Sequence, residues 1–173
     1  NGSIKVNQKE VGLTWGEVEF IYNGVNQLPT ATATGLVNND ECLVTVTGEK
    51  VNVGEYEATA SSLSNSNYKL PVNVTKGFEI KKAQLTVTAN DEEVTYGDLA
   101  PSYTVTYNGF VNNETKEVLG GELSFACEYE KTSNVGNYDI VASGYTSDNY
   151  EITYVNGSIK VNQKEVGLTW GEV

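Results

Sequence analysis

The sequence predicts an all-β protein, mainly antiparallel, made of two small β-sheet domains in tandem with at most one short helix. The main observation is a repeat, because residues Asn1–Val18 recur without a change as Asn156–Val173. Repetition at a fixed period is typical of arrays of small units that contact their neighbours. Two further observations are the alternation of apolar and polar residues with a period of two and the abundance of Tyr, Thr, Val, Asn and Gly. We therefore expect the chain to span slightly more than one period of a longer array.

A second and weaker repeat lies inside this period and divides it into two related units. We expect residues 1–8 to form the closing strand of a preceding B unit, residues 9–82 to form unit A, and residues 83–162 to form unit B. Residues 163–173 are then the opening strand of the next A unit. The segments that match between the units, in pairs, are Asn52–Ala60 with Asn134–Ala142, Gly35–Asp40 with Gly109–Glu114, and Thr14–Glu17 with Thr95–Asp98.

Apolar residues alternate with polar ones along most of both units, which predicts strands with one buried face. Unit B has an insertion, Asn112–Leu119, that could form a short helix with Asn112 at its cap and a Gly-Gly pair at its end. Cys42 and Cys127 lie on apolar faces, and we expect both to be buried, reduced thiols. The sets expected to face inward are Val18, Phe20 and Tyr22; Cys42, Val44 and Val46; Tyr56, Ala58 and Ala60; Leu85, Val87 and Ala89; Leu123, Phe125, Cys127 and Tyr129; Tyr138, Ile140 and Ala142; and Ile159 with Val161.

No linker rich in Gly, Pro or Ser separates the units. Apolar residues recur through both crossings, at Ile80–Leu85 and at Val161–Val166, so we expect both segments to be extended. The predicted arrangement is an extended rod of roughly collinear units, each either β-grasp-like or Ig-like in topology. Gly2–Asn7 would then be frayed or paired with a neighbouring molecule, whereas its identical twin Gly157–Asn162 would pair within unit B.

The composition excludes several classes of function. The 173 residues include no His, and all 11 basic residues are Lys, so neither a histidine general base nor a Ser-His-Asp triad is available. Two Cys alone cannot complete a conventional zinc site. A net charge of −12 without any Arg opposes binding to nucleic acids, and no apolar run approaches the ~20 residues of a membrane span. We therefore predict no enzymatic activity, no catalytic, cofactor-binding or metal-binding residues, no nucleic-acid partner and no membrane insertion.

Four aromatic residues allow a choice between a structural role and a binding role. Tyr56 and Tyr138 follow Val-Gly-x at the start of a strand, which favours a tyrosine corner over ligand stacking. Trp15 and its copy Trp170 could form a sugar-stacking platform, although a Trp at the end of a first strand more often packs against a neighbouring unit.

Two acidic runs could supply oxygen ligands to Ca²⁺, namely Asn38–Glu41 and Asp91–Glu93 together with Asp98. Calcium takes six to eight oxygens from a shaped loop, and neither run has a recognisable spacing. Solvated turns are therefore the preferred interpretation of both runs, and calcium is the single cofactor considered.

Unit B contains a series of short signatures along nearly its whole length: Ala89, Val94-Thr-Tyr-Gly-Asp98 and Pro101; Tyr107-Asn-Gly-Phe110; Asn134-Val-Gly-Asn-Tyr138; and Asp148-Asn-Tyr150 with Tyr154-Val-Asn-Gly-Ser158-Ile159. These signatures resemble the MBG-type repeats of large bacterial cell-surface adhesins. Unit A departs from the pattern, because Trp15 replaces the Tyr and the insertion is absent. The resemblance implies small all-β or β-grasp-like domains strung between a cell-surface anchor and a distal head, without catalytic residues.

Two functions from different classes follow from these observations. The first is a structural stalk or spacer of a bacterial surface adhesin or filament, extracellular and at the cell surface, whose partners are the neighbouring repeats of the same chain. The alternative is a carbohydrate- or mucin-binding module that binds host or environmental glycans weakly in each unit and strongly through avidity. At least two exposed aromatic side chains aligned on one surface of each unit would favour binding, whereas inward aromatic side chains would favour the stalk.

Overall fold

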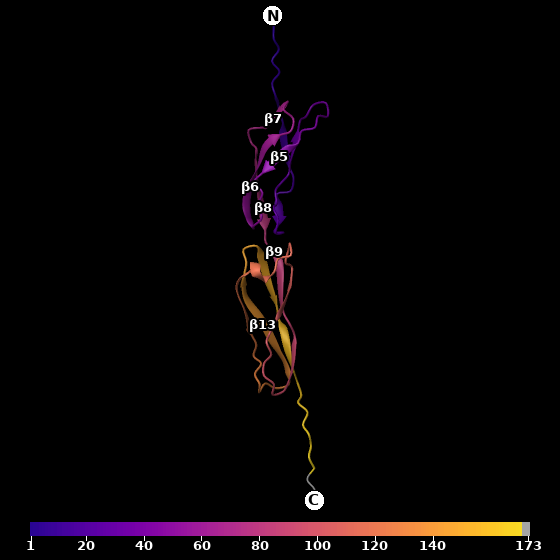
Figure 1. The fold of residues 1–173 in the computed structure, drawn as a ribbon, viewed down its shortest axis with the longest axis vertical. Coiled ribbons are helices and arrows are strands. Elements are labelled where there is room, and N and C mark those ends of the chain that lie inside the picture. Colours follow the sequence, from indigo (N-terminus) through magenta and orange to yellow (C-terminus); the bar gives the residue numbers. More distant parts are fainter. Residues whose placement is uncertain (171–173) are drawn as a thin grey trace. The chain divides into compact units, whose positions relative to one another are not determined.

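The computed structural model describes residues 1–170 of the protein and divides the chain into two compact units, Asn1–Ala83 and Gln84–Val173 (Figure 1). This division lies one residue from the boundary expected between residues 82 and 83. We keep the names unit A and unit B and describe each unit by itself. Apart from one 3₁₀ turn, all regular structure in residues 1–170 is β-strand, so the all-β prediction is confirmed.

Unit A is built from short strands that form three sheets. The largest sheet has the strand order β3-β8-β6-β5, and two smaller sheets contain β2-β4 and β1-β7. Its strands are β1 (Lys9–Glu10), β2 (Gly12–Trp15), β3 (Glu19–Ile21), β4 (Ala31–Thr34), β5 (Val44–Thr47), β6 (Gly54–Leu63), β7 (Tyr68–Lys69) and β8 (Thr75–Lys81).

Unit B is built from strands that form two sheets, of order β10-β15-β13-β12 and β11-β9-β14. Only Lys82 separates β8 from β9, and only Asn156 separates β14 from β15. The elements of unit B are β9 (Ala83–Ala89), β10 (Glu92–Thr95), β11 (Val105–Asn108), the 3₁₀ turn η1 (Lys116–Val118), β12 (Gly120–Ala126), β13 (Gly136–Thr146), β14 (Tyr150–Val155) and β15 (Gly157–Asn162).

Antiparallel pairs prevail, as expected, but strands from the beginning and the end of each unit pair in parallel. In unit A, β1 pairs with β7 and β3 pairs with β8 in parallel. In unit B, β10 pairs with β15 in parallel, while β15 pairs with β13 antiparallel on its other side. The sheets are therefore mixed. Alternation along a strand shows which side chains are buried but not which strand lies beside it, so the sequence did not predict this feature.

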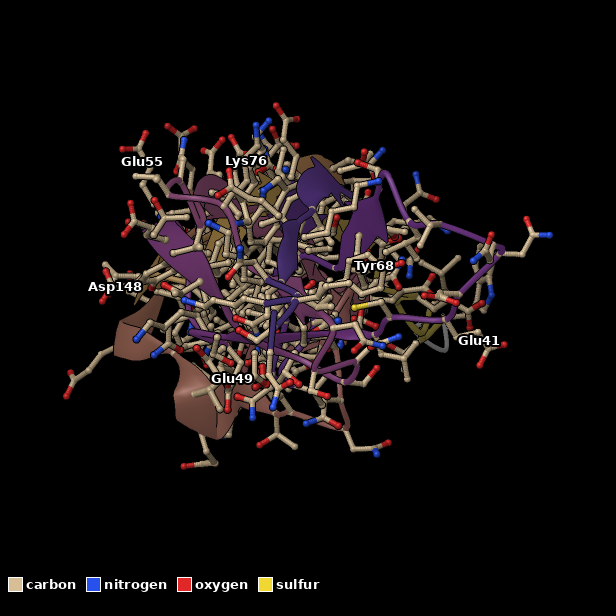
Figure 2. All side chains as sticks on the ribbon, turned by 90° about the horizontal axis from the view of Figure 1, so that it is seen from above. Glu41, Glu49, Glu55, Tyr68, Lys76 and Asp148 are labelled. Carbon is tan, nitrogen blue, oxygen red and sulfur yellow. The ribbon has the colours of Figure 1, made fainter. Side chains whose placement is uncertain are left out.

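The residues expected to face inward are buried or half-buried, which confirms the period-two interpretation. Charged side chains such as Glu41, Glu49 and Glu55 instead extend outward from unit A (Figure 2). The core of unit B contains Ala89, Tyr129, Ile140, Ala142, Ile159 and Val161. Buried apolar residues of unit A include Val11, Ala33, Cys42, Ala58, Ala60, Tyr68, Phe78 and Ile80.

The segment Asn112–Leu119 holds the one helical element of residues 1–170, a 3₁₀ turn, but the helix start considered at Asn112 is wrong. Asn112 and Asn113 have φ angles of 50° and 59°, and the N–H of Glu114 donates to the carbonyl of Val111 at 2.9 Å, which closes a tight turn. Only Lys116–Val118 forms a 3₁₀ turn, and its cap is Thr115 rather than Asn112. A right-handed helix cannot pass through two left-handed residues, and the short remainder of the segment cannot nucleate one by itself.

The match between Thr14–Glu17 and Thr95–Asp98 is also wrong as an alignment of the two units. The N–H of Tyr96 donates to the carbonyl of Asn162 at 2.9 Å in unit B, and the N–H of Tyr22 donates to the carbonyl of Lys81 at 2.8 Å in unit A. Tyr22, rather than Trp15, is therefore the structural counterpart of Tyr96. Trp15 lies earlier, in β2, where it pairs with Ala31 of β4.

Candidate functional site

The first and last strands of unit B lie side by side along nearly the whole unit. β9 is the neighbour of β14, and β10 is the neighbour of β15. The register is continuous, because the side-chain contacts Gln84–Glu151, Asp91–Ser158 and Glu93–Lys160 each join residues 67 positions apart. We term residues 83–95 and 150–162 the terminal strand pair of unit B.

Side chains reinforce this pair where β10 meets β15. The carboxylate of Asp91 accepts hydrogen bonds from the backbone N–H of Ser158 at 2.7 Å and from its hydroxyl at 3.2 Å. Glu93 Oε1 accepts from Asn162 Nδ2 at 2.6 Å and from Lys160 Nζ at 3.2 Å. The hydrogen bond from Asn162, followed by that from Lys160, holds the pKa of Glu93 below its usual value. These side chains are solvent-exposed, so each contact by itself contributes little to equilibrium stability.

Unit A contains a shorter version of the same arrangement. Lys9 of β1 lies beside Tyr68 of β7, and Phe20 of β3 lies beside Ile80 of β8. The pairing is interrupted between these two stretches, because β2 leaves to pair with β4. We term residues 9–21 and 68–81 the terminal strand pair of unit A.

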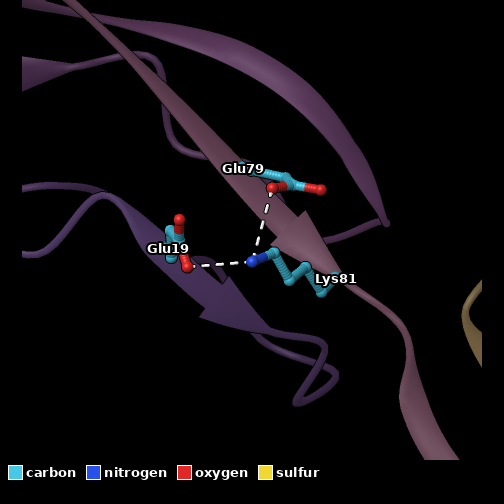
Figure 3. Close-up of polar contacts among 3 residues, drawn as sticks. All are labelled: Glu19, Glu79 and Lys81. Carbon is cyan, nitrogen blue, oxygen red and sulfur yellow. Dashed lines mark hydrogen bonds and ion pairs between the residues drawn. The ribbon is translucent and has the colours of Figure 1, made fainter.

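Ion pairs also join the two sides of the pair in unit A. Lys69 Nζ lies 3.1 Å from a carboxylate oxygen of Glu10. Lys81 Nζ lies 2.8 Å from Glu19 across the strands and 3.7 Å from Glu79 on its own strand, as Figure 3 shows. The hydrogen bond and charge of Lys81 lower the pKa of Glu19. The ion pairs Lys69–Glu10, Lys81–Glu19 and Lys160–Glu93 each join the two sides of a terminal strand pair.

A second feature that the units share is a tight turn held by a buried tyrosine. In unit A, the hydroxyl of Tyr68 accepts a hydrogen bond from the N–H of Val37 at 2.9 Å and donates one to Asp40 at 2.8 Å. The two Asn residues within this turn have positive φ angles, which Asn tolerates better than most residues. The counterparts in unit B are Tyr150, Val111 and Glu114.

Burial, followed by the hydrogen bond to Glu114, raises the pKa of Tyr150 to about 12. The hydroxyl of Tyr150 therefore stays protonated near neutral pH and keeps its role as a donor to Glu114. Because the same three-residue contact recurs in unit A, we interpret it as a structural device that fixes the turn.

The predicted tyrosine corners are confirmed. The hydroxyl of Tyr56 donates to the carbonyl of Asn52 at 3.0 Å, and that of Tyr138 donates to the carbonyl of Asn134 at 2.9 Å. In both cases the partner lies four residues upstream, where the chain turns into the long strand β6 or β13. The ring of Tyr56 also packs on Phe78, with 5.7 Å between ring centroids. Both tyrosines are therefore committed to the fold.

Both cysteines are free thiols, as predicted. Cys42 is buried in the cluster of Val11, Ala33 and Tyr68. Cys127 is only half-buried, so the prediction that both thiols are buried is wrong for this residue. Cys127 lies just beyond the end of β12, where the sheet no longer covers the side chain fully.

The acidic runs considered as calcium ligands act as hydrogen-bond acceptors in the fold. Asp91 and Glu93 bind β15, Asp98 accepts from the N–H of Thr95 at 2.9 Å, and Asp40 accepts from Tyr68. In the part of the chain that the structure describes, no three side chains of His, Cys, Asp and Glu come together in a group that could hold a metal ion. The preference for solvated turns over calcium ligands stays an untested prediction.

Aromatic side chains in the folded units are mostly turned inward. Between residues 9 and 162, Tyr96 is the one exposed aromatic residue, with 43% of its surface accessible. Trp15 is half-buried, while its copy Trp170, beyond β15, is 90% exposed. No unit therefore presents two exposed aromatic side chains that could form a stacking platform within this range.

The first copy of the repeated segment forms strands in its second half, whereas the second copy forms a strand in its first half. Gly157–Asn162 forms β15, whereas the identical residues Gly2–Asn7 are exposed and outside any strand, as predicted. Conversely, Lys9–Trp15 contains β1 and β2, whereas the identical residues Lys164–Trp170 are exposed and outside any strand. Each copy thus supplies strands to the unit beside it with only one of its halves.

Family comparison places these units in a known class. Residues 16–77 and residues 85–160 each match the MBG domain of the YGX type. The chain belongs to the MBG domain family. Its two MBG domains correspond to units A and B, and the Tyr-Gly of the type description fits Tyr96-Gly97 after β10. No curated protein matches the chain. The structure shows no helix within residues 1–170 with the length and apolarity that a membrane span requires.

Sequence reasoning missed the terminal strand pairs and the tyrosine-held turns. The pairs leave no local signal, because parallel strands that are far apart in sequence carry no shared motif. The turns did leave one: Gly35–Asp40 and Gly109–Glu114 match between the units, and Asn67-Tyr68 matches Asn149-Tyr150. Because both the turn and the distant tyrosine recur in the two units, their joint recurrence could have suggested that the tyrosine contacts the turn.

Proposed function

We propose that this pair of MBG domains is a stalk or spacer segment of a bacterial surface adhesin or filament, which projects a distal head from the cell. The proposal places the chain outside the cell, at its surface, and makes the neighbouring repeats its main partners. It includes no catalytic activity.

The observation that carries the proposal is the division of the repeated segment. In copy one, residues 9–15 belong to unit A, and in copy two, residues 157–162 belong to unit B. A segment whose first half closes one domain and whose second half opens the next is suited to join domains without a linker. Copying such a period lengthens the array without a new interface, and length is what a spacer provides.

The chain between the two domains supports this interpretation. Since Lys82 alone separates β8 from β9, little chain is available for free movement between the domains. We therefore propose that the domains form an extended and roughly collinear pair. A net charge of −12 also suits a surface protein that must stay soluble and resist self-association.

Small-angle X-ray scattering of the chain tests the proposed extension. A compact globule of this length has a radius of gyration of roughly 15 Å. The proposal predicts a clearly larger radius of gyration and a distance distribution with the long tail of a rod. A value near that of a compact globule, or a profile that requires freely varying angles between the domains, would contradict it.

A glycan-binding module remains the alternative function. The inward position of most aromatic side chains weighs against it, because weak sugar sites usually stack a ring on the sugar. A glycan-array and mucin-binding assay on a chain of two periods separates the two functions. Specific binding that grows with the number of periods would support the alternative.

A further inference from the structure

From the terminal strand pairs we infer that each MBG domain is a mechanical clamp, which resists a pulling force applied between its two ends. The inference rests on the proposed stalk function only for its biological purpose, because the resistance itself follows from the topology of each domain. A stalk that carries a head at a distance must transmit tension without unfolding.

The direction of the load follows from the parallel pairing. In unit B, force reaches the domain through the start of β9 and leaves it through the end of β15. Since 83–95 and 150–162 run in the same direction and side by side, opposite forces at these two points slide one strand along the other. The hydrogen bonds between them then lie across the force and must break together.

A different loading would be much weaker. If two paired strands are pulled apart from one end, their hydrogen bonds open one after another, and each bond contributes little by itself. Parallel terminal strands avoid this opening, because the chain ends leave the pair at opposite ends. Forced unfolding is governed by the unfolding barrier and not by equilibrium stability, so this geometry can matter even where free energies are modest.

The ion pairs support the inference independently. Lys69–Glu10, Lys81–Glu19 and Lys160–Glu93 all lie across a terminal strand pair, at 2.8–3.2 Å. Exposed ion pairs add little to equilibrium stability, but each adds a contact that sliding must break. Asp91 adds a fourth connection, because its carboxylate holds the backbone N–H of Ser158 at the start of β15.

The two domains should differ in strength. The pair in unit B keeps one register through both of its sheets, because Gln84–Glu151 in β9–β14 and the four residue pairs from Glu92–Ile159 to Thr95–Asn162 in β10–β15 all join residues 67 positions apart. The pair in unit A is interrupted, with two residue pairs at β1–β7 and three at β3–β8. Under tension on the whole chain, we therefore expect unit A to unfold at a lower force than unit B.

Single-molecule force spectroscopy on the whole chain tests the clamp through two attachment geometries. Both use a background without native thiols, Cys42→Ala with Cys127→Ala. Attachment at Lys82→Cys and Gln163→Cys loads the terminal strand pair of unit B along its strands. Attachment at Leu99→Cys and Gln163→Cys pulls the ends of β10 and β15 apart from the same side; both positions are exposed.

The clamp predicts that unit B unfolds at a several-fold higher force in the first geometry than in the second. Chemical denaturation of both variants serves as the control and should give equal stabilities. Equal forces in the two geometries, or a lower force along the strands, would overturn the inference. Failure here would leave the scattering test of the extended stalk untouched, so the two ideas can fail separately.

Glu93→Gln provides a second readout at the contact itself. It removes the charge that faces Lys160, and it should lower the unfolding force of unit B along the strands. Glu122→Gln, on β12 outside the terminal strand pair, is the matched control and should leave the force unchanged. An equal effect of the two variants would show that net charge, and not the clamp, sets the force.

Discussion

The two copies of the repeated segment have the same sequence but different structures. The first copy forms strands in its second half, and the second copy forms a strand in its first half. Ile159 is fully buried, whereas its twin Ile4 is 93% exposed. Val11 is 3% exposed, whereas its twin Val166 is 79% exposed. Nothing in the local sequence distinguishes the members of each pair, so local propensity cannot explain the difference.

The difference comes from the strands that lie beside each half. Residues 157–162 form β15, with β10 on one side and β13 on the other. Residues 9–15 contain β1, which pairs with β7, and β2, which pairs with β4. A strand is therefore a property of its neighbours at least as much as of its own residues. The repeated segment therefore contains two separate strand-forming stretches, one for each domain.

The largest expected effect concerns the twin isoleucines. Ile159→Ala should destabilise unit B by about 2–5 kcal/mol, because it leaves a cavity in a fully packed core. Ile4→Ala should change the stability by less than about 0.5 kcal/mol, because the side chain contacts little. Urea unfolding of both variants, with hydrogen exchange to assign the loss to unit B, checks the comparison. Similar losses of stability from the two substitutions would contradict the difference in burial between Ile159 and Ile4.

The twin glycines should give the next largest difference. A Cβ at Gly157 would lie 2.5 Å from the carbonyl oxygen of Ala89, whereas a Cβ at Gly2 would have no neighbour within 4 Å. Gly157→Ala should therefore cost about 1–3 kcal/mol through overpacking, and Gly2→Ala should be neutral. The melting temperature of unit B is a sufficient measurement. A neutral Gly157→Ala would mean that β15 lies farther from the turn after β9 than the structure shows.

The twin valines test the other half of the segment. Val11→Ala removes two buried methyl groups from the cluster around Tyr68 and should cost unit A about 1.5 kcal/mol. Val166→Ala should have no measurable effect. The denaturation midpoint of unit A gives the answer, and an equal shift by both substitutions would show that residues 164–170 are also packed.

The smallest expected effect concerns the twin lysines. The pKa of Glu93 is lowered by Asn162 first and by Lys160 second. Because the folded pKa is lowered, this contribution to stability is present above the usual pKa of a Glu and is lost as the pH falls through the folded value. Lys160→Met should raise the pKa of Glu93, measured by NMR titration of its carboxyl carbon, whereas Lys5→Met should leave it unchanged. An unchanged pKa of Glu93 in the Lys160 variant would show that Lys160 and Glu93 do not form an ion pair in solution.

The sequence predicted the features that depend on one strand at a time. The buried faces of β6, β9 and β13, the tyrosine corners at Tyr56 and Tyr138, and the contrast between Gly2–Asn7 and Gly157–Asn162 are all confirmed. Each of these follows from residues that are close together in the chain or from the repeat itself.

Features that depend on distant partners were missed or wrong. The parallel pairing of β10 with β15 joins residues far apart in the chain, and alternation does not encode it. The four-residue match at Thr14–Glu17 misaligned the units, because a short motif cannot fix a register when the chain between motifs differs. The helix start considered at Asn112 was wrong because Tyr150, far along the chain, holds residues 111–114 as a tight turn.

The most direct test of the account is hydrogen exchange, followed by NMR, on a chain extended by one further period. The repeated segment at residues 156–173 then lies between unit B and a following unit A. The account predicts that amides 164–170 become protected to the level of amides 9–15, while amides 157–162 keep their protection. If residues 164–170 exchange as fast in the longer chain as in the present one, the segment does not join neighbouring domains, and the proposed stalk loses its basis.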